Sequence, residues 1–262
     1  MNSKFKRQLK KLNKQEKKIL NKKENKLVKL KINPIRDKIE SKIPDKVKNA
    51  LDIAFFKGFH LVFEKGNQYI EKTYDKDKIK LEHDLNNYKI DEKVNRKHIK
   101  ELDRQSRRSK IFNSSFSILE GGALGVLGIG LPDIPLFIAT IMKNIYEIAL
   151  SYGYDYEREE ERVYILLIIC GAMTQGKPQL AFNDQIDRLG HNIDQGVYNE
   201  VNLEEQIRVT SNILSDSMLA AKFVQGIPII GAVGGIVNYN IINKIGKYAS
   251  IKYKKRYLLR KE

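Results

Sequence analysis

The acidic side chains in and beside the most apolar part of the chain have the types and spacing that could do chemistry. Glu120, Asp133, Glu147 and Asp155 are spread over two expected helices and the turns around them. Glu147 falls on the helix face that is expected to be buried. A buried carboxylate can have a raised pKa and act as an acid or a base. Glu147 and Asp133 are therefore the candidate catalytic residues. Helix capping by the aspartates and ion pairing of the glutamates are the alternative.

Histidine and cysteine residues suggest no second reactive centre. The four histidines, His60, His83, His98 and His191, are far apart in the sequence, and no CxxC or HExxH motif accompanies them. No metal site and no cofactor are therefore expected. The lone Cys170 lies in the apolar run VYILLIICGAM, where a thiol is typically a small buried hydrophobic group and not a nucleophile. A single cysteine also excludes an intrachain disulfide.

The glycine-rich stretch GGALGVLGIGLPDIP lacks the pattern of a phosphate-binding loop. Such a loop needs Lys and then Ser or Thr directly after its glycines, but Leu-Pro-Asp follows Gly130. No strand is expected before the stretch, and the GxSxG turn of serine hydrolases is missing from the chain. The stretch is therefore interpreted as a structural element.

The glycines of this stretch recur every three residues, which places them near one face of a helix and lets another backbone approach. Leu-Pro-Asp then breaks the helix, and Asp133 is placed to cap the next one. Asp155 is placed in the same way before the helix that follows. A second segment, GIPIIGAVGGIVNYNIINKIG, repeats the combination of glycine, proline and aliphatic residues. The predicted structural positions are Gly122, Gly125, Gly128, Asp133, Asp155, Gly231 and Gly234.

The two segments are apolar enough to raise the question of a membrane span. Residues 123–142 contain one charged residue and residues 223–242 contain none, and a transmembrane helix needs about 20 mostly apolar residues. Both stretches, however, contain proline and several glycines. We expect close packing of both segments at the centre of one helical domain. A broken hairpin that dips into one leaflet and a full span are the alternatives.

Positive charge is concentrated at the two ends of the chain. The 262 residues have a net charge of +16, with +13 in residues 1–50, +7 in residues 243–262 and −4 between them. Basic ends on a mildly acidic body indicate arms that bind a polyanion. No apolar segment follows the N-terminal lysines as it does in a secretory signal, so a cytoplasmic protein is expected.

Residues 5–32 combine this charge with a helical apolar repeat, which Asn33-Pro34 ends. A basic amphipathic helix is typical of a membrane-surface element, and a partly disordered tail is the alternative. Nucleic-acid binding by this arm is a third, weaker hypothesis, because no aromatic residues alternate with the lysines. The residues expected to bind anionic lipid are Lys6, Arg7, Lys10, Lys11, Lys14, Lys17 and Lys18, with Lys252, Lys254, Lys255 and Arg256 near the C-terminus.

Helical periodicity covers most of the remaining chain, and no strand-rich region occurs. Residues 75–94 are expected to form a loop or an exposed helix, and residues 174–200 are polar and loop-like. The predicted fold is all-α: a basic amphipathic or partly disordered arm over residues 1–44, then a single multi-helix domain over residues 45–262. The two Gly/Pro-broken segments lie at its centre. The predicted helices span residues 45–74, 95–118, 134–152, 157–173 and 201–224.

Three ordered segments resemble the EcsC family of bacterial proteins. They are RRSKIFNSSFSILEGGALGVLGIGLPDIPLFIATIMKNIYEIALSYGYD, IPIIGAVGGIVNYNIINKIGKYA and the tail YKKRYL. The resemblance covers roughly residues 45–260 and leaves the basic arm outside. It implies a predominantly helical protein, and the name-giving member of the family is encoded beside an ABC transporter. The resemblance supplies no catalytic residues.

Charge and resemblance together predict a peripheral protein at the inner face of the cell membrane, accessory to membrane transport or envelope processes. Its expected partners are an anionic membrane surface and a membrane transporter. The alternative is an enzyme that acts on a lipid-like or peptide substrate through a carboxylate in an apolar pocket. The sequence leaves the oligomeric state open.

Overall fold

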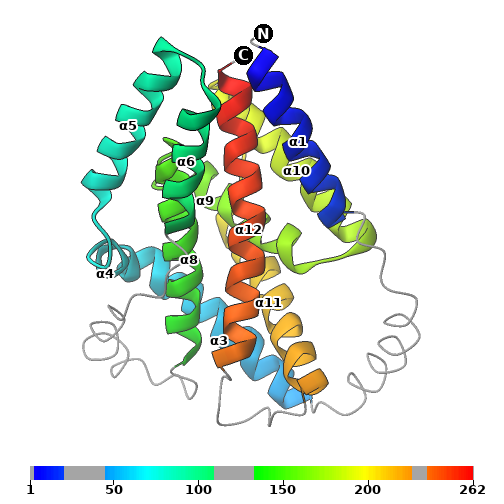
Figure 1. Cartoon of the computed structure of the whole chain (residues 1–262). Helices are drawn as coiled ribbons and strands as arrows, with labels where there is room; N and C mark the ends of the chain where they lie inside the picture. Colours follow the sequence, from blue (N-terminus) through cyan, green and yellow to red (C-terminus); the bar gives the residue numbers. More distant parts are fainter. Residues whose placement is uncertain (1–2, 21–44, 109–132, 226–234, 262) are drawn as a thin grey trace.

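The computed structural model describes residues 3–20, 45–108, 133–225 and 235–261, in which helices are the regular elements and no strand occurs (Figure 1). These helices surround one hydrophobic core, which confirms the predicted all-α single domain. The elements are α1 (Ser3–Leu20), α3 (Asp45–Leu61), the π-helical turn η1 (Val62–Gly66), α4 (Asn67–Glu71), α5 (Lys76–Glu92), α6 (Arg96–Arg108), α8 (Asp133–Ser151), α9 (Glu159–Met173), α10 (Gly176–Asp194), α11 (Leu203–Gln225) and α12 (Gly235–Arg260).

Helix α9 lies in the interior, as its uniformly apolar sequence predicts. It packs against α10, α11 and α12, and every residue from Val163 to Ala172 is buried. Three glutamates occupy its first turn, where the positive end of the helix dipole favours acidic side chains. Helix α9 therefore supplies the apolar centre around which the polar elements are arranged.

Helices α8 and α12 run side by side (Figure 1), and these are the helices into which the two Gly/Pro segments lead. Gly246 of α12 faces Asn144 of α8, and a Cβ atom on Gly246 would lie 2.3 Å from the Asn144 Oδ1. Only glycine permits this approach without a shift of the neighbouring side chain. Gly246 was not among the predicted structural glycines, and those that were lie outside the described residues: Gly122, Gly125, Gly128, Gly231 and Gly234.

Helix α8 is also the one helix in the described part of the chain that is long and apolar enough to cross a membrane. The qualifying window spans Ile134–Ser151, and 83% of it is buried inside the protein. A core helix of a globular domain meets the same criterion, so the window is weak support for a span.

The prediction of a loop over residues 174–200 is wrong, because residues Gly176–Asp194 form α10. The buried stripe of α10 has helical spacing, but two of its members are polar. The Gln179 amide donates to the Gly171 carbonyl at 2.9 Å, and Asn183 Oδ1 accepts from the Tyr248 hydroxyl at 2.8 Å. Buried polar groups that find such partners can stand in a helix interface, but an apolar repeat does not reveal them.

The helix predicted over residues 45–74 is present as α3, η1 and α4 in direct succession. For the next segment, residues 75–94, a loop and an exposed helix were both expected alternatives. The structure has the exposed helix, α5. Asp75 caps it by accepting a hydrogen bond from the Lys78 amide at 2.9 Å. Its weak apolar period has a plain cause: only His83 and Ile90 of this helix are buried.

Candidate functional site

Helix α1 lies along α12 and also contacts α10 (Figure 1). Its residues Phe5, Leu9 and Leu12 recur at helical spacing and are buried by this packing. The predicted cations of the helix all remain exposed: Lys6, Arg7, Lys10, Lys11, Lys14, Lys17 and Lys18. The apolar side of the amphipathic helix is thus covered by protein, and its basic side faces solvent.

An ion-pair cluster fixes the C-terminal half of α1 to the domain. Glu16 interrupts the apolar stripe, yet it is buried, with its two carboxylate oxygens bonded to the ammonium groups of Lys252 and Lys255. Asp187 of α10 accepts from the same two lysines at 2.9 and 2.8 Å. Although burial acts to raise the pKa of Asp187, the two lysines hold it below its ordinary value. Two acids and two lysines therefore join α1, α10 and α12.

Arg256 is enclosed in the same way, one helical turn further on. Its guanidinium donates two hydrogen bonds to Glu161, at 2.9 and 3.1 Å, and two to Asp194, at 2.7 and 3.1 Å. It lies 4.2 Å from the ring centre of Tyr154 and 4.4 Å from that of Tyr164. Such bidentate pairs and ring contacts suit arginine in particular.

These contacts correct the prediction for the four C-terminal residues of the lipid-binding set. Lys252 and Arg256 are buried, Lys255 is paired within the cluster, and Lys254 donates to Asp103 of α6 at 2.7 Å. The acids Asp187 and Asp194 that pair with these side chains lie on α10, the segment wrongly predicted to be a loop. The exposed cations of the predicted set therefore all lie on α1, whereas its four C-terminal cations form ion pairs within the domain.

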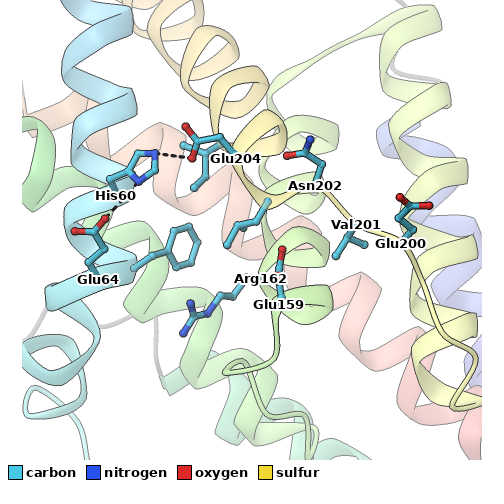
Figure 2. A pocket seen from close by; sticks show the side chains of 11 residues that line it. His60, Glu64, Glu159, Arg162, Glu200, Val201, Asn202 and Glu204 are labelled. Atoms are coloured by element: carbon cyan, nitrogen blue, oxygen red, sulfur yellow. Dashed lines mark ion pairs between the residues drawn. The ribbon is translucent and has the colours of Figure 1, made fainter.

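A pocket of 690 Å³ lies between η1 and the first turns of α9 and α11 (Figure 2). His60 stands at its edge between two carboxylates: its Nε2 is 3.0 Å from Glu204 and its Nδ1 is 3.7 Å from Glu64. Arg162 lies over the Phe63 ring at 5.5 Å, and its Nε is buried without a hydrogen-bond partner. The sequence shows only the His60–Glu64 spacing along one helix, because Glu204 comes from a distant segment.

This pocket is acidic and open. Glu159 and Glu200 line it beside Glu64 and Glu204, so the lining holds four carboxylates and one arginine. The side chains of His60, Glu64 and Glu204 are 31%, 66% and 56% exposed, so solvent weakens their pairing. No group of His, Cys, Asp or Glu within the described ranges has the arrangement of a metal site. Among the described residues that line the pocket, no Ser, Thr, Cys, Tyr or Lys side chain accompanies His60.

Glu147 is buried, as predicted, on the inner face of α8. One carboxylate oxygen accepts from Lys143 at 3.1 Å, and the other has no hydrogen-bond partner. Burial raises its pKa, and Lys143 opposes the rise. Glu147 does not line the pocket beside His60 or three further hollows between described residues.

The two aspartates predicted as helix caps have different outcomes. Helix α8 begins at Asp133, close to the predicted start, but the Asp133 side chain lies outside the described residues. The prediction for Asp155 is wrong, because α9 begins at Glu159 and Arg158 occupies the cap position. Asp155 instead accepts from the Glu157 amide at 2.9 Å in the preceding turn. Glu120 also lies outside the described residues.

Cys170, His83 and His98 have structural partners. Cys170 is fully buried near the Thr210 hydroxyl, and burial raises the pKa of its thiol to about 12. Its interpretation as a small buried group is confirmed. His83 shares a hydrogen bond with the Ser151 carbonyl at 3.0 Å, and His98 with the Lys89 carbonyl at 3.1 Å. Burial lowers the pKa of His83.

Fold and surface define a helical domain that carries a basic helix on its flank. The chain belongs to the EcsC protein family, whose family model matches residues 6–258. The match includes α1, whereas the resemblance in the sequence was traced only from residue 45. The predicted boundary after residue 44 follows a stretch outside the described residues and stays a prediction.

Two curated relatives come from Bacillus subtilis (strain 168). Protein EcsC is 26% identical over 156 residues, which are 58% of this chain and 61% of the relative. Uncharacterized protein YdbA is 29% identical over 149 residues, which are 54% of this chain and 52% of the relative. The aligned part thus spans between half and two thirds of the curated relatives. No solved structure matches this chain.

Proposed function

We propose that this protein is a peripheral membrane protein that binds anionic lipid through the exposed side of α1, at the inner face of the cell membrane. The observation that carries the proposal is the division of α1 into a buried apolar side and an exposed basic side. Glu16 is the single acidic residue of this helix, and it is buried against α12. The outward side of α1 therefore carries basic and neutral polar side chains and no acidic one.

The energetics of such a surface favour adsorption to an anionic bilayer. A lysine or arginine close to anionic lipid contributes about 1 kcal/mol, so a few of these cations suffice for measurable binding. The attraction falls off over roughly 10 Å at moderate ionic strength. Binding is therefore expected to need direct contact of α1 with the surface and to weaken with salt.

The mode of attachment follows from the packing of α1. Phe5, Leu9 and Leu12 are 5%, 9% and 4% exposed, so the apolar residues that an inserted amphipathic helix would bury in lipid already contact the domain. In our proposal the helix stays docked and attaches by charge alone. Helices α8 and α12 remain in the core.

The proposed role is accessory to membrane transport or envelope processes, with a membrane transporter as a partner. This part rests on membership of the EcsC family, whose name-giving member is encoded beside an ABC transporter. The curated relatives add only the printed names Protein EcsC and Uncharacterized protein YdbA. The enzyme alternative has no comparable support, because Glu147 pairs with Lys143 away from the described hollows.

Cosedimentation with vesicles of phosphatidylcholine, with and without phosphatidylglycerol, tests the proposal. We expect binding only with phosphatidylglycerol, and loss of binding at high salt. A variant that neutralises four exposed lysines of α1 should bind at least about a hundredfold more weakly. A variant that neutralises four exposed lysines beside and on α5 is the control. The first set is Lys6, Lys10, Lys14 and Lys17, and the second is Lys72, Lys78, Lys89 and Lys93, each replaced with Gln.

Equal binding to neutral and anionic vesicles would contradict the proposal, and so would an equal loss in the two variants. Binding that survives both high salt and the α1 substitutions would move the attachment to the Gly/Pro segments. A shift of a DNA or RNA probe that exceeds binding to anionic vesicles would favour the nucleic-acid hypothesis instead.

A further inference from the structure

A hollow of 580 Å³ lies between α1, α6 and α12, next to the exposed basic side of α1. Four lysines line it: Lys11 and Lys18 from α1, and Lys247 and Lys254 from α12. One carboxylate, Asp103 of α6, lies in the same wall. The hollow therefore has an excess of positive charge, unlike the pocket of Figure 2, which is lined by four glutamates and one arginine.

The single acid of the hollow is already paired. Asp103 accepts from Lys254 at 2.7 Å and from the Tyr152 hydroxyl at 3.2 Å. Among the described residues, no ion pair involves Lys11, Lys18 or Lys247. Lys11 and Lys18 lie two turns apart along one side of α1, and Lys247 reaches the hollow from α12. Three lysine side chains from two helices are thus available to one anionic group.

Three apolar side chains also line the hollow. Leu12 and Ile19 of α1 and Ile251 of α12 line it, and Ile19 packs only partly against the core. Cations beside apolar side chains in one hollow match a molecule with an anionic head and a hydrocarbon part. A purely ionic ligand gains nothing from such apolar side chains.

We propose that this hollow binds one anionic phospholipid, with the phosphate between Lys11, Lys18 and Lys247 and the glycerol and upper acyl chain against the apolar side chains. The inference deepens the proposed function and rests on it, because the hollow opens beside the surface that α1 would turn toward the bilayer. An anionic phospholipid is the proposed occupant because the hollow has an excess of positive charge and adjoins that basic surface.

The test measures binding of monomeric dihexanoylphosphatidylglycerol by titration calorimetry. A monomeric lipid presents no charged bilayer surface, so its binding reports the hollow and not the general attraction of α1 to a membrane. We expect saturable binding with one lipid per protein. Dihexanoylphosphatidylcholine at the same concentrations should bind at least about tenfold more weakly, and inorganic phosphate should not saturate.

The chain offers a matched pair of double variants on α1. Lys11→Gln with Lys18→Gln changes the hollow, whereas Lys10→Gln with Lys17→Gln removes the same charge one position away, outside the hollow. Lysine and glutamine have similar helix propensities, so both variants should fold. The hollow variant should bind the monomeric lipid about tenfold or more weakly, and the outer variant within about twofold of the unchanged protein. Lys247→Gln should weaken binding without altering α1.

The outcomes separate the inference from the proposed function. Vesicle binding without saturable binding of the monomeric lipid would overturn the inference and leave the proposed function intact. An equal effect of the two double variants on the monomeric lipid would also overturn it. Inorganic phosphate that binds as tightly as the lipid would show that the apolar side chains contribute nothing to binding. That result would contradict a phospholipid as the occupant. Saturable lipid binding without vesicle attachment would support the hollow and contradict the membrane role.

Discussion

Glu16 of α1 and Lys252 of α12 form an ion pair in the interior, where their side chains are 7% and 1% exposed. The two residues come from opposite ends of the chain. Lys252 also donates to Asn183 and Asp187 of α10, so a residue at the edge of α1 is tied to two other helices. This contact explains why α1 packs on the domain and does not stand apart as a free arm.

Replacement of Glu16 with Ala should release α1. The change leaves Asp187 as the only carboxylate partner of Lys252 and Lys255, and loss of one partner of a buried pair costs roughly 3 kcal/mol. We expect a loss of this size in the free energy of unfolding, measured with urea, together with faster proteolysis near the N-terminus. Asn13→Ala, at an exposed position of the same helix, is the control. Identical unfolding of the two variants would show that the pair does not hold α1.

Glu147 should make stability depend on pH. Its folded pKa is raised by burial, so the folded state favours the protonated acid. The stability that protonated Glu147 contributes to the folded state is fully present below the unfolded pKa of about 4.3. It is lost as the pH rises through the higher folded pKa. Glu147→Gln should therefore remove a fall in stability above about pH 4.3, measured as melting temperature against pH.

The pH profile of the unchanged protein, measured in the same buffers, is the reference for this prediction. If Glu147→Gln lowers the melting temperature at neutral pH and leaves the slope intact, then Glu147 is stabilised as an ion by Lys143 and the prediction is wrong.

Close approach of α8 and α12 should depend on Gly246. A Cβ atom there would meet the Asn144 side chain, and overpacking of this kind costs roughly 1–3 kcal/mol. Gly246→Ala should lower the unfolding free energy by that amount. In the double variant with Asn144→Ala the clash is gone, so the two costs should not add. Strict additivity in the double-mutant cycle would contradict the proposed contact.

The sequence revealed the parts of the fold that depend on apolar periodicity. The all-round apolar α9 and the buried side of α8 with Glu147 follow from side-chain pattern alone, because hydrophobic burial is the dominant local signal. Helix α10 was missed because its buried stripe includes Gln179 and Asn183, whose hydrogen-bond partners come from other helices.

That one error had a consequence for the candidate site. With α10 predicted as a loop, Asp187 and Asp194 had no place beside the C-terminal cations, so Lys255 and Arg256 were expected to face a membrane. Similarly, Glu16 was interpreted as an interruption of the α1 stripe. A charge pattern predicts net attraction to a polyanion, but it does not show which cations find acids within the fold, since those partners are distant in sequence.

Arg256 should not tolerate even a conservative change. Its guanidinium donates hydrogen bonds to both Glu161 and Asp194. It also contacts the rings of Tyr154 and Tyr164. Lysine keeps the charge but lacks the planar donors for two bidentate pairs, so it would leave a buried carboxylate poorly paired. Arg256→Lys should cost roughly 3 kcal/mol in urea unfolding.

Arg208→Lys is the control, because Arg208 is 58% exposed beside Glu205 and its replacement should cost less than about 1 kcal/mol. Equal costs would mean that charge alone, and not the geometry of the guanidinium, holds the end of α12 in the domain.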